Sequence, residues 1–164
     1  MTTSTGLAGD GRPSARAERL VRELVGRERI AAMRCELCVS AMAPIAPALC
    51  AVLEDAAATH KQHLRWLAAS AVEAPRLTWP ERLRAHVAVA WQRALLALSD
   101  WAALARLRAA EQVLSRRQAH AAARLRGPLC RLLREHLLPE QRRVERSVAS
   151  LARHGRVASF GRGH

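Results

Sequence analysis

A chain of 164 residues suits a single domain, and an apolar content of 50% is enough for most of it to fold around one core. The 27 basic and 14 acidic residues give a formal net charge of +13, nearly all from arginine because Lys61 is the only lysine. The polar segment Met1–Arg16 has no apolar stretch typical of a secretory signal, and no uncharged apolar run of about 18 residues predicts a membrane span. We therefore expect a cytoplasmic protein with reduced thiols and no membrane partner.

Alanine and leucine supply most of the apolar residues, and few segments alternate as strands require, so the composition predicts an all-α fold. Residues 1–15 are predicted to form a disordered tail before a helical domain at 16–154. The first helix is predicted from Ala17 to Ala43, where Pro44 interrupts it. Its apolar positions include Leu20, Leu24, Ile30, Met33 and Leu37.

The second helix is predicted from Pro47, a residue suited to a first helical turn, to Val72. Apolar residues recur in it at intervals of three and four, as an amphipathic helix requires, and His60 lies on the same stripe. The stripe consists of Leu49, Val52, Leu53, Ala56, His60, His63 or Leu64, and Leu67. A loop is predicted to follow over 73–78.

The next helix is predicted to start at Thr78, with Glu81 completing a capping box. It carries an apolar stripe of Leu83, Val87, Trp91 and Leu95. Asp100 is predicted to cap a separate helix, although one long kinked helix is the alternative. The stripe after Asp100 reads Leu104, Leu107, Glu111, Leu114 and Gln118.

Gly127-Pro128 predicts a stop followed by the start of the last helix. Pro139 is expected to kink this helix, and Gly155 is expected to end it before a flexible basic tail at 155–164. The predicted stripe contains Leu129, Leu132 or Leu133, His136 or Leu137, Glu140, Val144, Val148 and Leu151.

Four metal-capable side chains fall on these apolar stripes, namely His60, Glu111, His136 and Glu140. An ionisable group buried without a partner costs several kcal/mol, so such groups are normally paired, hydrogen-bonded or bound to a metal. Imidazole and carboxylate together suit iron, zinc or manganese without selecting among them. The alternative is that these four side chains form a buried hydrogen-bond network, or lie at the edge of their stripes and face water.

The cysteines offer a second chemistry. Cys35 and Cys38 form a lone Cys-x-x-Cys pair within the first helix, which allows a redox or zinc role. Cys50 and Cys130 do not form a second pair, so the alternative is that the thiols act as small core residues. The four tryptophans are predicted to pack near helix ends, and no catalytic motif is present, which favours a non-enzymatic protein.

The segment Asp100–Gln112, with Trp91 upstream of it, resembles the third main helix of a family of small bacterial ferritin-like proteins of unknown function, distantly similar to rubrerythrin-type bundles. Ala46–Leu49 and Pro128-Leu129 resemble the starts of the second and fourth main helices, and the resemblance covers about residues 18–152. It implies an antiparallel ferritin-like four-helix bundle with a short extra helix before the third main helix.

The resemblance also implies a core metal site and a role in stress or metal handling. Glu36 matches the first-helix carboxylate, so the metal ligands predicted are Glu36, His60, Glu111, His136 and Glu140. Thr59 and Val144 stand where the family has an acid and a histidine, which indicates a degraded site instead of a catalytic di-iron centre.

The positive charge supports a second function, an arginine-rich interaction module that binds nucleic acid or an acidic partner. However, arginines occur in every predicted helix and no aromatics interleave with them, as base stacking would require. The first function is therefore preferred. A homodimer is compatible with the sequence, which does not locate an interface.

Overall fold

The computed structural model describes residues 15–44, 46–70 and 78–160, and the side chains of these residues except 16 and 154–160. Nearly all of this part of the chain is helical, which confirms the all-α prediction. Residues 1–14 of the tail predicted at 1–15, residues 73–77 of the loop predicted at 73–78, and residues 161–164 of the basic tail predicted at 155–164 lie outside the described residues. No helix within the described residues carries an apolar stretch long enough to cross a membrane.

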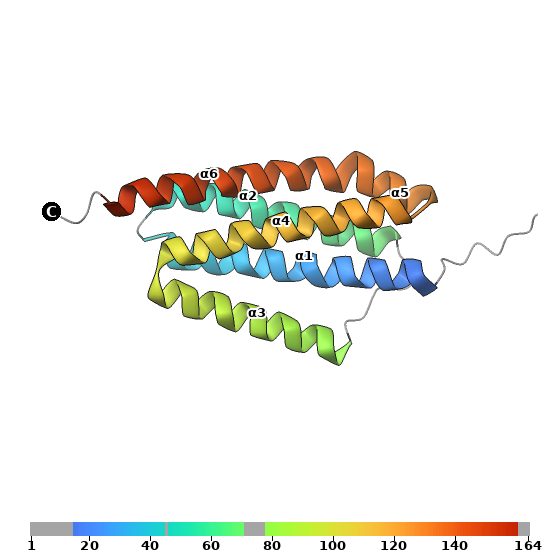
Figure 1. Ribbon diagram of the computed structural model, residues 1–164, viewed down its shortest axis with the longest axis horizontal. Helices are drawn as coiled ribbons and strands as arrows, with labels where there is room; N and C mark the ends of the chain where they lie inside the picture. Colours follow the sequence, from blue (N-terminus) through green and yellow to red (C-terminus); the bar gives the residue numbers. More distant parts are fainter. Residues whose placement is uncertain (1–14, 45, 71–77, 161–164) are drawn as a thin grey trace, which may run out of the picture.

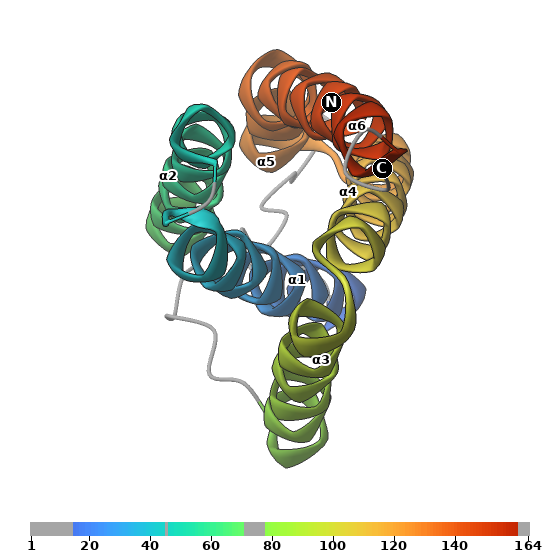
Figure 2. The ribbon, with the colours of Figure 1, turned by 90° about the vertical axis from the view of Figure 1, so that its left-hand side faces the viewer.

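Four long helices lie alongside one another, and a fifth packs against their outside (Figures 1 and 2). The elements are α1 (Ala15–Met42), α2 (Pro47–Ser70), α3 (Trp79–Leu98), α4 (Asp100–Arg124), α5 (Gly127–Leu132), the π-helical segment η1 (Leu133–Leu137) and α6 (Leu138–Phe160). Helices α1 and α2 run in opposite directions, as do α4 and α6. Helix α3 returns the chain to the end from which α4 starts, and it contacts α1 and α4.

Local hydrogen bonds determine where α3 and α4 begin. The backbone N–H of Thr78 donates to the Glu81 carboxylate at 2.7 Å, which confirms the capping box of α3. Helices α3 and α4 are separate, because Ser99 has extended backbone angles between them. The cap of α4 is Ser99, whose Oγ accepts the N–H of Ala102 at 3.3 Å, so the prediction that Asp100 caps this helix is wrong.

The last helix is continuous from Gly127, but its hydrogen-bond pattern changes before Pro139. Proline cannot donate to a carbonyl four residues earlier, and the chain forms the wider π-helical turn η1 just upstream. The helix then continues past Gly155 to Phe160, so the prediction that it ends at Gly155 is wrong. A glycine is tolerated inside a helix at a modest free-energy cost.

Helix α3 is a full-length helix of 20 residues instead of the short one predicted, and most of it is exposed. Its predicted apolar stripe faces outward, with Val87 59% and Trp91 55% exposed. Gln92 is its one buried residue among those described, and its amide donates to the Cys38 sulfur and to the Ala103 carbonyl. The prediction that tryptophans pack near helix ends is therefore wrong for Trp79 and Trp91.

The core consists of two hydrophobic clusters that lie along the length of the four long helices. One contains Cys35, Cys38, Leu53, Leu104, Leu107, Val144 and Val148 among its members, and the other contains Val21, Leu24, Leu67, Ala121, Leu133 and Leu137. In each long helix, buried polar residues lie in the sequence between the residues of one cluster and those of the other. They are Glu28 in α1, His60 and His63 in α2, Glu111 and Gln118 in α4, and Gln141 in α6. The two apolar clusters thus enclose a polar layer.

Gly127 starts α5 with a φ of +69°, a conformation that costs other residues about 1–2 kcal/mol. A Cβ atom at this position would have no other atom within 4 Å, so a substitution changes the stability only through backbone strain. Gly127→Ala is expected to lower the free energy of unfolding by about 1 kcal/mol in urea denaturation. Gly127→Asn should cost less, since asparagine tolerates left-handed angles. Equal stability of the alanine variant and the native protein would contradict this account.

Candidate metal centre

The polar layer is built around one carboxylate, Glu28 of α1, which is fully buried. Its Oε2 lies 2.8 Å from Nδ1 of His60 and 3.3 Å from Nδ1 of His63, both on α2. Its other oxygen accepts a hydrogen bond from the amide of Gln118 on α4. Glu28 therefore connects three helices through its two oxygens.

The second nitrogens of both imidazoles face further carboxylates. His60 Nε2 lies 3.3 Å from Glu111 Oε2, and His63 Nε2 lies 3.2 Å from Glu140 Oε2. The amide of Gln141 donates to Glu111 Oε2 at 2.7 Å. Each histidine is thus bracketed by two acids, as occurs where imidazole orientation is fixed by hydrogen bonds around a metal.

Burial and neighbouring charges shift the pKa values of Glu28 and His60 in opposite directions. Burial by itself raises the pKa of Glu28, but hydrogen bonds from His60 and His63 and their positive charge outweigh it and bring the pKa to about 2. Burial likewise lowers the pKa of His60, but the Glu111 carboxylate, the Cys35 thiol and Glu28 raise it well above 6.5. Without a metal, the pair is therefore ionised: a carboxylate beside an imidazolium.

Among the described residues, two groups of three side chains place potential ligand atoms within 4.8 Å of one another, and both use His60. One is Glu28, His60 and His63; the other is Cys35, His60 and Glu111. In the first group, Glu28 Oε2 is hydrogen-bonded to the Nδ1 atoms of both histidines. In the second, His60 Nε2 forms an ion pair with Glu111 Oε2, whereas the other oxygen of that carboxylate, Oε1, is buried without a hydrogen-bond partner. A buried oxygen without a partner is costly, and a cation held by these side chains would satisfy it.

The thiols of Cys35 and Cys38 are fully buried. Burial raises the pKa of Cys38 to about 12, and burial also raises that of Cys35, although His60 opposes the shift. All four cysteines are free. A thiolate is the form that reacts in redox exchange, so these pKa shifts count against a redox role of the Cys-x-x-Cys pair. Coordination to a metal deprotonates a thiol directly, so Cys35 remains a ligand candidate.

The structure brings together three of the five ligands predicted from sequence: His60, Glu111 and Glu140. Glu36 lies outside the layer, where its half-exposed carboxylate pairs with Lys61 at 2.6 Å. His136 is also outside, because η1 turns it to the surface, where its ring lies 5.5 Å from that of Trp66. Placement of these two residues in the core was therefore wrong.

Sequence analysis missed Glu28, His63 as a ligand, and Gln141. Glu28 belongs to a series at alternating intervals of three and four residues that runs along the buried face of α1: Val21, Leu24, Glu28, Ala31, Cys35, Cys38 and Met42. Because three of the seven residues in this series are alanine or cysteine, the larger Ile30 and Met33 suggested a different face. Reading Cys and Ala as core residues would have found Glu28.

The comparisons with known proteins return nothing: no protein-family model, no curated protein and no solved structure matches the chain. The resemblance to ferritin-like proteins therefore stays a prediction, and the site is interpreted from its own geometry.

The low pKa of Glu28 predicts acid sensitivity of the metal-free protein. Because the pKa falls from 4.5 in the unfolded chain to about 2 in the folded one, the ionised group stabilises the fold above pH 4.5. This contribution, on the order of 3 kcal/mol, is lost as the pH falls toward 2. Urea unfolding in the presence of a chelator should show a much shallower decline in stability over this pH range for Glu28→Gln. The exposed Glu54→Gln serves as the control and should keep the native slope; equal slopes for both variants would refute the assignment.

Proposed function

We propose that this protein is a ferritin-like four-helix bundle that binds one divalent transition metal ion in its core, with Cys35, His60 and Glu111 as ligands. The observation that carries the proposal is that the Cys35 thiol, a His60 nitrogen and a Glu111 oxygen lie within 4.8 Å of one another, while Glu111 Oε1 is buried without a hydrogen-bond partner. His60 Nε2 and Glu111 Oε2 are 3.3 Å apart. Tetrahedral zinc bonds of about 2.1 Å place ligand atoms about 3.4 Å apart, so little movement is needed.

The remaining polar residues support these ligands. Glu28 accepts the Nδ1–H of His60 at 2.8 Å, which leaves Nε2 as the nitrogen available to a metal. Gln141 holds the Glu111 carboxylate through its amide. Sulfur, nitrogen and oxygen donors together favour zinc over manganese, and iron is the second choice among the predicted metals.

The surroundings favour retention of a metal over catalysis. His60 and Glu111 are fully buried, and apolar clusters enclose the layer on both sides. None of the candidate ligands lines either of the two cavities that lie beside α3. A substrate would need a path to the ion, so we favour a non-enzymatic role in metal handling.

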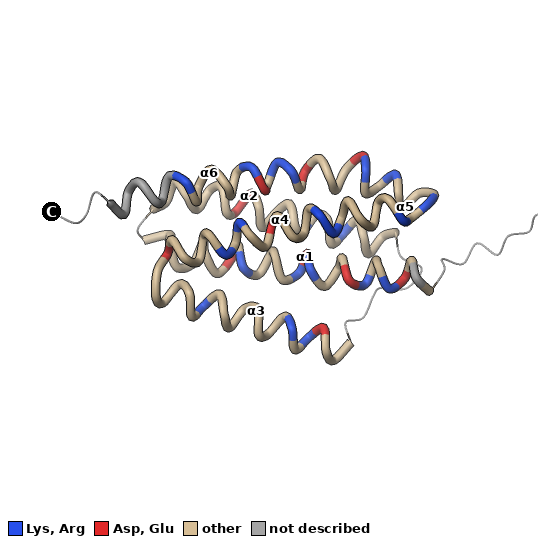
Figure 3. The backbone as a smooth tube through the Cα atoms, in the orientation of Figure 1, with Lys and Arg blue, Asp and Glu red and all other residues tan. Residues whose placement is uncertain are grey.

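The alternative function, an arginine-rich interaction module, has weaker support. It requires arginines gathered on one face, whereas Figure 3 shows basic residues on all the long helices. The converging polar layer is the more specific feature, because scattered surface arginines are also what a solvated helical surface contains.

Metal analysis with matched variants tests the proposal. The purified protein is expected to bind one zinc ion per chain, and free zinc at 100 times Kd should raise its stability by about 3 kcal/mol. His60→Asn and Glu111→Gln should abolish both effects. Glu36→Gln and His136→Asn, which alter predicted ligands outside the layer, should retain them. No zinc in the native protein, or equal zinc in the His60 variant, would refute the proposal.

Cobalt substitution separates the two ligand groups. If Cys35 is a ligand, the cobalt-loaded protein should show thiolate-to-cobalt charge-transfer absorption that Cys35→Ser eliminates. Cys130→Ser is the matched control, since Cys130 lies apart and donates to the Ala122 carbonyl. Cobalt binding without the charge-transfer band would instead assign the ion to Glu28, His60 and His63.

A further inference from the structure

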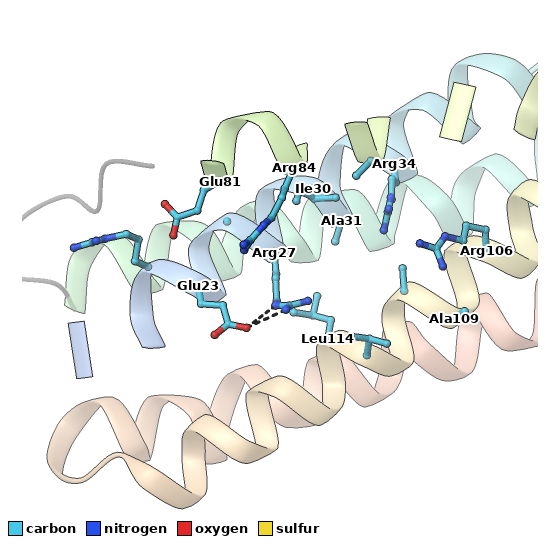
Figure 4. A pocket seen from close by; sticks show the side chains of 15 residues that line it. Glu23, Arg27, Ile30, Ala31, Arg34, Glu81, Arg84, Arg106, Ala109 and Leu114 are labelled. Atoms are coloured by element: carbon cyan, nitrogen blue, oxygen red, sulfur yellow. Dashed lines mark hydrogen bonds and ion pairs between the residues drawn. The ribbon is translucent and has the colours of Figure 1, made fainter. Parts of the chain in front are cut away.

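A cleft of about 330 Å³ lies between α1, α3 and α4, on the side of α1 away from the polar layer (Figure 4). Its apolar lining comes from Ile30 and Ala31 of α1 and from Ala109, Val113 and Leu114 of α4. This volume is at the lower end of the range for small-molecule sites. Farther along α3, the Gln92 amide connects this helix to Cys38 of α1 and to Ala103 of α4.

The charged residues around the cleft are mostly arginines. Five arginines and two glutamates line it, an excess of three positive charges. Arg27 is paired with Glu23 at 2.9 Å, but Arg34, Arg84 and Arg106 form no ion pair with any described carboxylate. The cleft thus holds cations that its own acids do not neutralise.

Arg34 is the most unusual of these residues. Its residue surface is only 9% exposed, and its Nε is buried without a hydrogen-bond partner. Figure 4 shows its side chain and that of Arg106 extending toward one another in the cleft. A buried guanidinium next to a second cation is unfavourable unless an anion compensates it.

A second hollow, of about 490 Å³, adjoins the same cations. It is lined by Arg34, Arg84 and Arg106 together with the exposed apolar residues Leu83, Val87 and Trp91 of α3. The arginines therefore stand between two apolar surfaces. This arrangement fits a ligand with both an anionic and an apolar part.

We propose that the cleft beneath α3 binds a small amphiphilic anion. A carboxylate or phosphate head group contacts the guanidinium groups of Arg34 and Arg106, and an apolar chain lies on Ala109, Val113 and Leu114. Arginine suits this role because its planar group donates two parallel hydrogen bonds to such anions. The inference does not depend on the metal site.

Calorimetric titration of the full chain with octanoate and octyl phosphate tests the proposal. Acetate and inorganic phosphate supply the head group alone, and octanol supplies the chain alone. We expect saturable binding of one amphiphile per chain, at least tenfold tighter than any of these fragments. Affinity for octanoate no greater than for acetate and octanol would overturn the proposal.

Two variants locate the binding. Arg34→Met keeps much of the side chain's volume and should weaken octanoate binding at least tenfold. Because Arg34 is buried, its replacement also changes the packing of the fold. Arg106→Met, at an exposed position, provides an independent test with the same expected direction. Arg142→Met on α6 is the matched control and should bind as the native protein does. Undiminished binding by Arg106→Met would place the ligand elsewhere and refute the site.

Discussion

The hydrogen bond between Glu28 and His60 is the interaction on which the rest of the core depends. Both side chains are fully buried, and their atoms are 2.8 Å apart. An uncompensated carboxylate at this position would cost several kcal/mol, so it is tolerated only while its donors on α2 and α4 are in place. A rotation of α1 or a one-residue slide of α2 would leave the charge unpaired. The pair therefore restricts how the long helices pack, whereas the apolar clusters on either side permit several arrangements of similar free energy.

The four helices meet at one level through polar groups that differ in kind. Acids come from α1, α4 and α6, imidazoles from α2 and amides from α4 and α6. The amides of Gln118 and Gln141 each donate to a carboxylate, so they hold the acids without adding charge. We infer that this layer fixes the register of the helices as well as forming a site, because a purely apolar core of Ala and Leu would define the register poorly.

The sequence predicted the helices well, but not every helix face. The stripes of α2 and α4 were correct, and with them His60 and Glu111, because the leucines of these two helices recur regularly. Helix α1 is covered on two sides: Glu28 and Cys35 face the polar layer, while Ile30 and Arg34 face the cleft under α3. Because two faces of α1 are buried, its apolar residues do not follow a single helical stripe, and Glu28 was not predicted to lie in the core. In the last helix, the π-helical turn shifts the face by one position, so Gln141 is buried while Glu140 is only partly buried. Such a turn depends on Pro139 and its surroundings, which a constant period of 3.6 does not represent.

A metal at this site must compete with a proton for the same nitrogen. The acids that bracket His60 raise its pKa, so they stabilise the imidazolium in the metal-free protein. The same acids orient the ring and supply negative charge when the proton is replaced by a cation. A protonated His60 stabilises the fold below pH 6.5, and that contribution disappears as the pH rises through its elevated folded-state pKa. The proposed divalent ion would supply positive charge in that range, where His60 is neutral. The metal binding that we propose therefore rests on the same negative charges that stabilise the protonated His60 in the metal-free protein.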